Sequence, residues 1–171
     1  RPIWESGAAR PYLGAFAFHS WDATASDAAL TGLYDFGRST GLPIRTAEGG
    51  WDAFLWQRPS EFPGWPNALR LATVYVRVLK LTGASTLQYW QMLGRDYMLN
   101  DGTNGYPAWQ VVRQMQQQLP AGTVVVETSG DRGLLYSLAA RDGGDFVLYL
   151  VNGGASDEPV AVSGLPGGSY R

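Results

Sequence analysis

A glutamate in the first third of the chain lies where a side chain can do chemistry. Glu48 ends the apolar run Leu42–Glu48, which has the length of a short buried strand, and Gly49 and Gly50 follow it directly. A carboxylate that leaves a rigid strand where the backbone opens into a glycine turn is firmly held and still accessible. Such a group can act as a nucleophile or in acid–base chemistry. The alternative is a solvated turn residue without a chemical role.

A histidine and several tryptophans fall near other predicted strand ends or loops. His19 is the only histidine of the chain, which also has seven Trp and nine Tyr. We expect His19 to donate a hydrogen bond to Glu48 or to a ligand hydroxyl, although a lone histidine at an apolar strand end is often structural. Aromatic rings outside a core can stack on the flat C–H faces of sugars. The candidate sugar-binding residues are His19, Trp21, Trp51, Trp56 and Trp90; the alternative for each ring is core packing.

The elements that would position these side chains alternate between strand and helix. We predict a loop over residues 1–12, strands over 13–22, 42–48 and 85–93, and helices over 26–41, 66–82 and 106–119. Residues 49–66 form a long aromatic loop, a kind that is usually functional. One helix between successive strands implies parallel strands, whose carboxyl ends meet at one edge. The first part of the chain is therefore predicted to be α/β.

The pattern changes near Pro120. Short strands are predicted over residues 123–128, 134–140, 146–152 and 159–163, separated by Gly- and Asp-rich hairpin turns. These strands indicate an antiparallel β unit. We therefore predict two domains, residues 1–120 and residues 121–171.

Composition excludes several other kinds of function. The net charge is −2 and the 13 cations are scattered, so a nucleic-acid partner is not expected. With one His and no Cys, no transition-metal site or cofactor is expected. No apolar run is long enough to span a membrane, and Gly-x-Ser-x-Gly is absent, which disfavours esterase chemistry. The composition does not fix a compartment, but it is compatible with a secreted or periplasmic protein.

Taken in order, these segments resemble the end of a clan A glycoside hydrolase. In that clan a (β/α)8 barrel carries its nucleophilic Glu at the end of strand seven, and Leu42–Glu48 is similar to that motif, with Ala47 inserted between Thr46 and Glu48. Residues 16–21 look like strand six, and Tyr89-Trp90 looks like strand eight, whose Trp often floors the subsite of the reacting sugar. Residues 121–171 are similar to the β-sandwich appended in glucosylceramidase, xylanase and β-xylosidase-like families.

The resemblance implies a retaining enzyme acting on β-linked glycosides or polysaccharides, with Glu48 as nucleophile and no cofactor. A full barrel needs about 250 residues, so we expect only strands six to eight here, followed by an incomplete β-sandwich. None of the other four Glu fits the acid/base, which is expected outside this chain. We therefore expect an inactive fragment that needs the rest of the barrel or self-association. The alternative is a non-catalytic carbohydrate-binding or structural fragment that works only with another chain.

Overall fold

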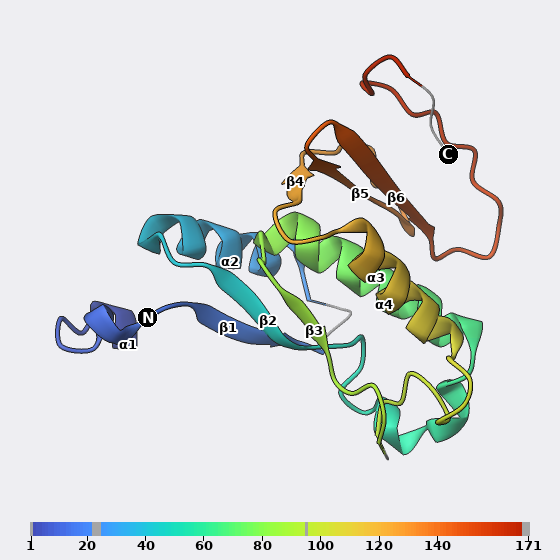
Figure 1. The fold of residues 1–171 in the computed structure, drawn as a ribbon, viewed down its shortest axis with the longest axis horizontal. Coiled ribbons are helices and arrows are strands. Elements are labelled where there is room, and N and C mark those ends of the chain that lie inside the picture. Colours follow the sequence, from blue (N-terminus) through green and yellow to red (C-terminus); the bar gives the residue numbers. More distant parts are fainter. Residues whose placement is uncertain (1, 22–24, 95, 169–171) are drawn as a thin grey trace.

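The first part of the chain forms a parallel sheet covered by helices on one side. The structure is a computed structural model that describes residues 2–21, 25–94 and 96–168. Strands β1 (Phe16–Ser20), β2 (Ile44–Gly49) and β3 (Leu87–Tyr89) are parallel and lie in the order β1-β2-β3. Helices α2 (Asp27–Thr40), α3 (Trp65–Thr82) and α4 (Pro107–Gln118) lie on one side of this sheet (Figure 1). The predicted α/β pattern with parallel strands is confirmed.

The helix boundaries follow the capping residues of the sequence. The Ser26 side chain accepts a hydrogen bond from the backbone N–H of Ala29 at 3.2 Å and so caps α2. Gly41 closes α2 with φ 71° and Gly83 closes α3 with φ 61°, a left-handed conformation that glycine adopts without a steric cost. These capping residues set where α2 and α3 end, and therefore where β2 and β3 can begin.

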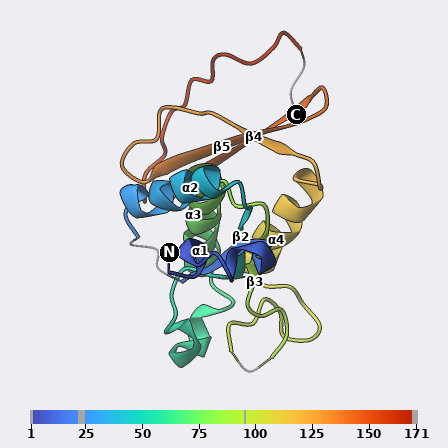
Figure 2. The ribbon, with the colours of Figure 1, turned by 90° about the vertical axis from the view of Figure 1, so that its left-hand side faces the viewer.

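The last third of the chain forms a second, antiparallel sheet. Strands β4 (Val124–Val126), β5 (Leu135–Asp142) and β6 (Asp145–Asn152) pair in that order, and β5 and β6 pack against α3. Figure 2 shows this sheet above α3. Leu138 of β5 and Val151 of β6 belong to the same hydrophobic core as α3. The sheet therefore buries one face against the helical layer.

A polar contact fastens the antiparallel sheet to α3. Lys80 Nζ lies 2.7 Å from Oδ2 of Asp131, while Oδ1 of Asp131 accepts hydrogen bonds from the backbone N–H and the hydroxyl of Ser137. One carboxylate therefore joins the end of α3, the loop before β5 and β5 itself.

Three sequence predictions need correction. Residues 159–163 are not a strand, because this segment pairs with no strand among the described residues and Pro159 has no N–H to donate. The third strand ends at Tyr89 rather than at residue 93. Within the predicted loop 1–12 there is a short helix α1 (Pro2–Glu5) and a 3-10 turn η1 (Arg10–Tyr12). Arg10 links the two, because its Nε donates to the carbonyl of Trp4 and its guanidinium lies 4.7 Å from the centroid of the Trp4 ring.

Candidate active site

An irregularity in β2 places Glu48 opposite His19. Phe18 pairs with Thr46, but the next residue, His19, pairs with Glu48, so Ala47 is an extra residue in β2. A β-bulge of this kind re-aims the side chains that follow it. In a regular ladder Ala47 would lie opposite His19, and Glu48 would turn to the other face of the sheet. The extra residue of the bulge is Ala47. This is the alanine by which Leu42–Glu48 differs from the clan A motif that it resembles.

The Glu48 carboxylate is held by two neighbours and remains accessible. The indole Nε1 of Trp21 donates to Oε2 of Glu48 at 3.2 Å, and Nδ1 of His19 lies 3.4 Å from the same oxygen. The Glu48 side chain is 29% exposed and the His19 side chain 55% exposed. Both contacts are made to Oε2, and Oε1 has no hydrogen-bond or ion-pair partner among the described residues. Of the site residues predicted from the sequence, the structure brings Glu48, His19 and Trp21 together.

Gly50 makes room for the Trp21 indole. A Cβ at position 50 would lie 2.1 Å from Cζ3 of Trp21, well inside van der Waals contact. The backbone N–H of Gly50 also donates to the carbonyl of Ser20 at 3.2 Å, which fastens the two strand ends together. Gly50 thus serves the position of Trp21 as well as the turn.

Tyr97 packs against the Trp21 indole and is a site residue that the sequence analysis missed. Its ring centroid lies 4.6 Å from that of Trp21, and its hydroxyl donates to the backbone carbonyl of Ala53. Its φ of 55° is uncommon for a residue with a side chain. Burial, and then the charges of Asp96, Asp52 and Glu48, raise the pKa of Tyr97. The residue therefore lies within the electrostatic reach of the Glu48 carboxylate.

Trp51 is a packing residue in this structure. It is 9% exposed, its Nε1 donates to Oδ1 of Asn67 at 2.7 Å, and the Arg70 guanidinium lies 4.6 Å from its ring centroid. Asn67 in turn donates to the carbonyl of Phe62 at 3.1 Å. With its ring packed in this way, Trp51 presents no open face to a sugar, so we leave it out of the proposed site.

Trp56 and Trp90 are exposed and could present a ring to a ligand. Each is 47% exposed. Trp90 directly follows Tyr89, which pairs with Gly49, so Trp90 lies at the same end of the sheet as Glu48. Trp56 lies farther along the aromatic loop, in the 3-10 turn η2 (Leu55–Gln57). Among the described residues, no hydrogen bond or ring contact joins either tryptophan to Glu48, so their part in a sugar site stays a prediction.

An ionic cluster braces the loop that follows Glu48. Arg58 contacts Oδ2 of Asp52 at 2.6 Å and Oε1 of Glu61 at 2.8 Å, and Asp52 accepts the backbone N–H of Phe54 at 2.7 Å. Burial alone raises the pKa of Asp52, but the Arg58 and Phe54 hydrogen bonds and the charges of Arg58 and Arg70 outweigh it, so that the pKa lies below its ordinary value. The charged form of Asp52 therefore stabilises this loop.

Among the residues that the structure describes, no three His, Cys, Asp or Glu side chains group as metal ligands. Within those residues, no helix is long and apolar enough to cross a membrane.

Comparison with known proteins gives a likeness of fold. No protein-family model matches the chain, and no curated protein matches it. Among solved structures it is similar to a GH30 endoxylanase from Clostridium papyrosolvens C71, with 15% sequence identity and a TM-score of 0.64. The match covers 88% of this chain and 36% of the endoxylanase chain. In fold, the chain is thus similar to a region that makes up about a third of that endoxylanase chain.

Proposed function

We propose that this chain carries the nucleophile half of the active site of a retaining glycoside hydrolase that acts on β-linked glycosides or polysaccharides. The observation that carries the proposal is the Glu48 carboxylate at the carboxyl end of β2, with Trp21 and His19 both on Oε2. The fold likeness to an endoxylanase supports it. A xylan-type substrate is the first one to test.

The geometry at Glu48 fits the attacking group of a double displacement. Oε1 forms a bond to the anomeric carbon, and the bond from that carbon to the leaving oxygen breaks, with its electron pair going to the oxygen. The N–H of Trp21 stabilises the negative charge on Oε2 and fixes the rotation of the carboxylate. Water then cleaves the glycosyl ester and regenerates the Glu48 carboxylate.

The second carboxyl group belongs outside this chain. A retaining enzyme needs its acid/base about 5–5.5 Å from the nucleophile. Glu5 lies on α1 and Glu127 just after β4, while Glu61 and Glu158 are paired with Arg58 and Arg132. We therefore propose that residues 1–120 form strands six to eight of a (β/α)8 barrel and that residues 121–171 form part of a β-sandwich. The remaining strands would supply the acid/base.

Turnover in a completed barrel tests this proposal. In a chimera, residues 1–171 replace the matched segment of the Clostridium papyrosolvens enzyme, and an aryl β-xyloside is the substrate. Glu48→Gln should lower kcat by at least about 10³-fold with little change in substrate binding, whereas Glu127→Gln, at an exposed position, should keep turnover.

In Glu48→Ala, added azide should restore turnover and give the α-glycosyl azide, because azide attacks from the face that the carboxylate has left. Full activity of Glu48→Gln would overturn the assignment.

A non-catalytic, carbohydrate-binding or structural role is the second candidate. The observation that favours it is that none of the four other glutamates lies at the carboxyl end of a parallel strand. This candidate predicts that xylo-oligosaccharides bind the chain equally well before and after Glu48→Gln, and that the chimera has no activity that depends on Glu48.

A further inference from the structure

Trp21 lies beyond the last residue of its strand, so the sheet alone does not fix the direction of its indole. β1 ends at Ser20, and the pairing of β1 with β2 ends there too, at Gly49. The hydrogen bond from Nε1 of Trp21 to Oε2 of Glu48 is nevertheless directional, since such a bond weakens steeply when the N–H turns away from its acceptor. Contacts outside the strand ladder must therefore hold the ring.

Tyr97 supplies a ring contact of this kind. Its ring centroid lies 4.6 Å from that of Trp21 and the two ring planes are tilted by 37°, which is a favourable aromatic arrangement. Trp21 follows β1, whereas Tyr97 lies in the loop between β3 and α4. Because β2 lies between β1 and β3, the pair joins the segments that follow the two strands on either side of Glu48.

The hydroxyl of Tyr97 ties its ring to the loop that follows Glu48. It donates a hydrogen bond to the backbone carbonyl of Ala53. Ala53 lies in a braced turn, in which Asp52 accepts the backbone N–H of Phe54 at 2.7 Å and contacts Arg58 at 2.6 Å. Burial, and then the charges of nearby carboxylates, raise the pKa of Tyr97, so its hydroxyl keeps the donated proton well above neutral pH.

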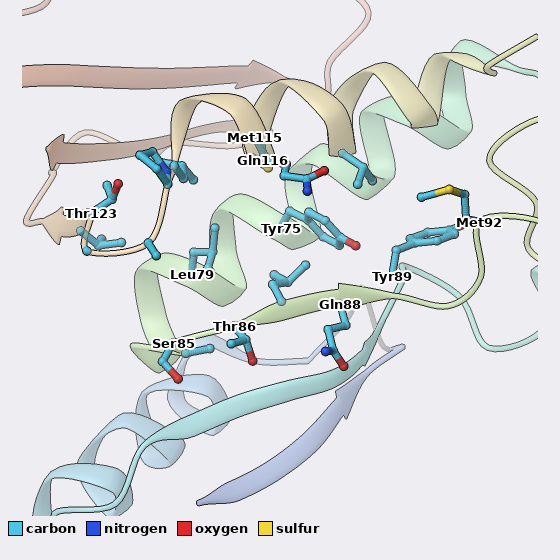
Figure 3. A pocket seen from close by; sticks show the side chains of 18 of the residues that line it. Tyr75, Leu79, Ser85, Thr86, Gln88, Tyr89, Met92, Met115, Gln116 and Thr123 are labelled. Carbon is cyan, nitrogen blue, oxygen red and sulfur yellow. The ribbon is translucent and has the colours of Figure 1, made fainter.

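The loop that carries Tyr97 is anchored in the core just after this residue. Leu99 is 1% exposed, its N–H donates to the carbonyl of Met92 at 3.2 Å, and its carbonyl accepts from the N–H of Tyr106 at 2.8 Å. Figure 3 shows Met92 beside the Tyr89 ring, where the chain leaves β3. The position of Tyr97 is therefore set by buried contacts of its loop.

Tyr97 also has a backbone conformation that a bulky side chain disfavours. Its φ is 55°, and among the described residues it is the one residue other than glycine with a positive φ. Asparagine or glycine would adopt this conformation at lower cost. Such outliers persist where the surrounding structure imposes them, and they cluster at functional sites. The tyrosine side chain therefore has a use that outweighs the backbone cost.

We propose that Tyr97 is a positioning residue of the proposed active site, which holds the Trp21 indole so that its N–H meets Oε2 of Glu48. It does so by joining the loop after β3 to the loop after β2. Tyr97 acts through the indole and takes no part in the chemical step. The inference rests on the proposed function for the role of Glu48, whereas the hold on Trp21 is a property of the fold.

A double-mutant cycle on covalent trapping of the chimera by an activated fluoroglycoside tests this role. Tyr97→Phe keeps the ring but loses the hydroxyl, and should slow trapping about 3-fold. Tyr97→Asn loses both and suits the left-handed backbone, and should slow trapping up to about 10-fold, the full effect expected for Trp21→Phe. In the Trp21→Phe background, neither change should slow trapping by more than about 1.5-fold, because the N–H that Tyr97 positions is gone.

Tyr149→Phe is the matched control. The Tyr149 hydroxyl also donates to a backbone carbonyl, that of Gln114 at 3.4 Å, but it lies on β6 of the antiparallel sheet. Its loss should leave the trapping rate within about 1.5-fold of the parent. Thermal midpoints report folding, and Tyr97→Phe, the smaller change, decides the matter if Tyr97→Asn does not fold. Slowing that persists undiminished in the Trp21→Phe background would overturn the proposal, since Tyr97 would then act without the indole.

Hydrogen exchange of the Trp21 indole N–H gives a second readout that needs no chemistry at Glu48. It is followed by NMR of the chimera with isotopically labelled tryptophan, and the signal is assigned by its absence in Trp21→Phe. Exchange should be at least about 3-fold faster in Tyr97→Phe and unchanged in Tyr149→Phe. Unchanged exchange in both Tyr97 variants would contradict the proposal.

The two proposals can fail separately. If the Tyr97 variants speed indole exchange but no adduct forms on Glu48, the proposed function fails and the hold of Tyr97 on Trp21 stands. If the adduct forms on Glu48 but neither trapping nor exchange responds to Tyr97, the positioning role alone is wrong.

Discussion

The indole N–H of Trp21 donates to Oε2 of Glu48 across the ends of two neighbouring parallel strands, at 3.2 Å. The two residues are 27 positions apart in the chain and meet because β1 and β2 end together. A bulge at Ala47 and the missing Cβ of Gly50 both serve this contact. The candidate nucleophile is therefore positioned by backbone features on its own strand as much as by its partners.

Replacing Trp21 with Phe should slow covalent trapping of Glu48 by an activated glycoside about 10-fold. This corresponds to about 1.4 kcal/mol, the scale of one hydrogen bond to a charged group. The aromatic ring that faces Tyr97 is kept, so the thermal midpoint should change little. Trp109→Phe is a matched control, because Trp109 also lies over a glycine, Gly105, but on α4. Equal trapping rates in the two variants would show that the Trp21 N–H has no part in the chemistry.

Gly50→Ala should destabilise the fold by about 1–3 kcal/mol, because the added methyl overlaps the Trp21 ring and the ring must move. Gly14→Ala is the control, since nothing lies within 4 Å of a Cβ there. That change should be neutral or stabilise by up to about 1 kcal/mol. Urea unfolding of both variants measures the difference, and a stable Gly50→Ala protein would contradict the packing of Trp21.

Deleting Ala47 should keep Glu48 opposite His19. The deletion removes the extra residue of the bulge, and regular alternation after Thr46 then places the glutamate on the face where it lies now. Trapping at this glutamate should stay within a few-fold of the parent rate. Inserting a second alanine after Ala47 should instead disturb the alternation and abolish trapping. If the deletion abolishes trapping and the insertion preserves it, β2 has no bulge in solution.

Asp52→Asn should lower the stability at neutral pH by about 1 kcal/mol, the range of an ion pair near the surface. Because the folded state lowers the pKa of Asp52 below its ordinary 3.8, the carboxylate stabilises the fold above that value. This contribution is lost as the pH falls through the lowered folded-state pKa. Urea midpoints of parent and variant, compared between pH 7 and pH 2, should therefore converge at the acid end. A constant difference over this range would rule out titration of Asp52 as its source.

The sequence predicted the parallel sheet, and with it that His19 would lie near Glu48, because both follow from local signals. Helix caps at Ser26 and Gly41 set where a strand can begin, and parallel strands bring their ends to one edge. The hydrogen bond itself was beyond prediction, because Trp21 lies past the end of β1 and its direction depends on Gly50.

Residues outside the regular elements were harder to predict. Tyr97 lies in a loop, and the course of that loop brings its ring to Trp21. Loop residues follow no hydrophobic periodicity from which this position could be predicted. Trp51 has the same sequence context as an exposed loop tryptophan, and only the position of Asn67 and Arg70 shows that it is buried. The segment 159–163 alternates like a strand but pairs with no strand among the described residues. Each of these outcomes depends on tertiary contacts that local patterns do not encode.

The central claim is that Glu48 is a nucleophile, and covalent trapping in the completed chimera tests it most directly. A 2,4-dinitrophenyl 2-deoxy-2-fluoro-β-xylobioside has a leaving group that departs without protonation, so the second carboxyl group is not needed. Peptide mapping by mass spectrometry should find one glycosyl adduct, on Glu48, in the parent and in Glu127→Gln, and none in Glu48→Gln. An adduct on another carboxylate, equal labelling of Glu48→Gln, or no adduct at all would contradict the claim.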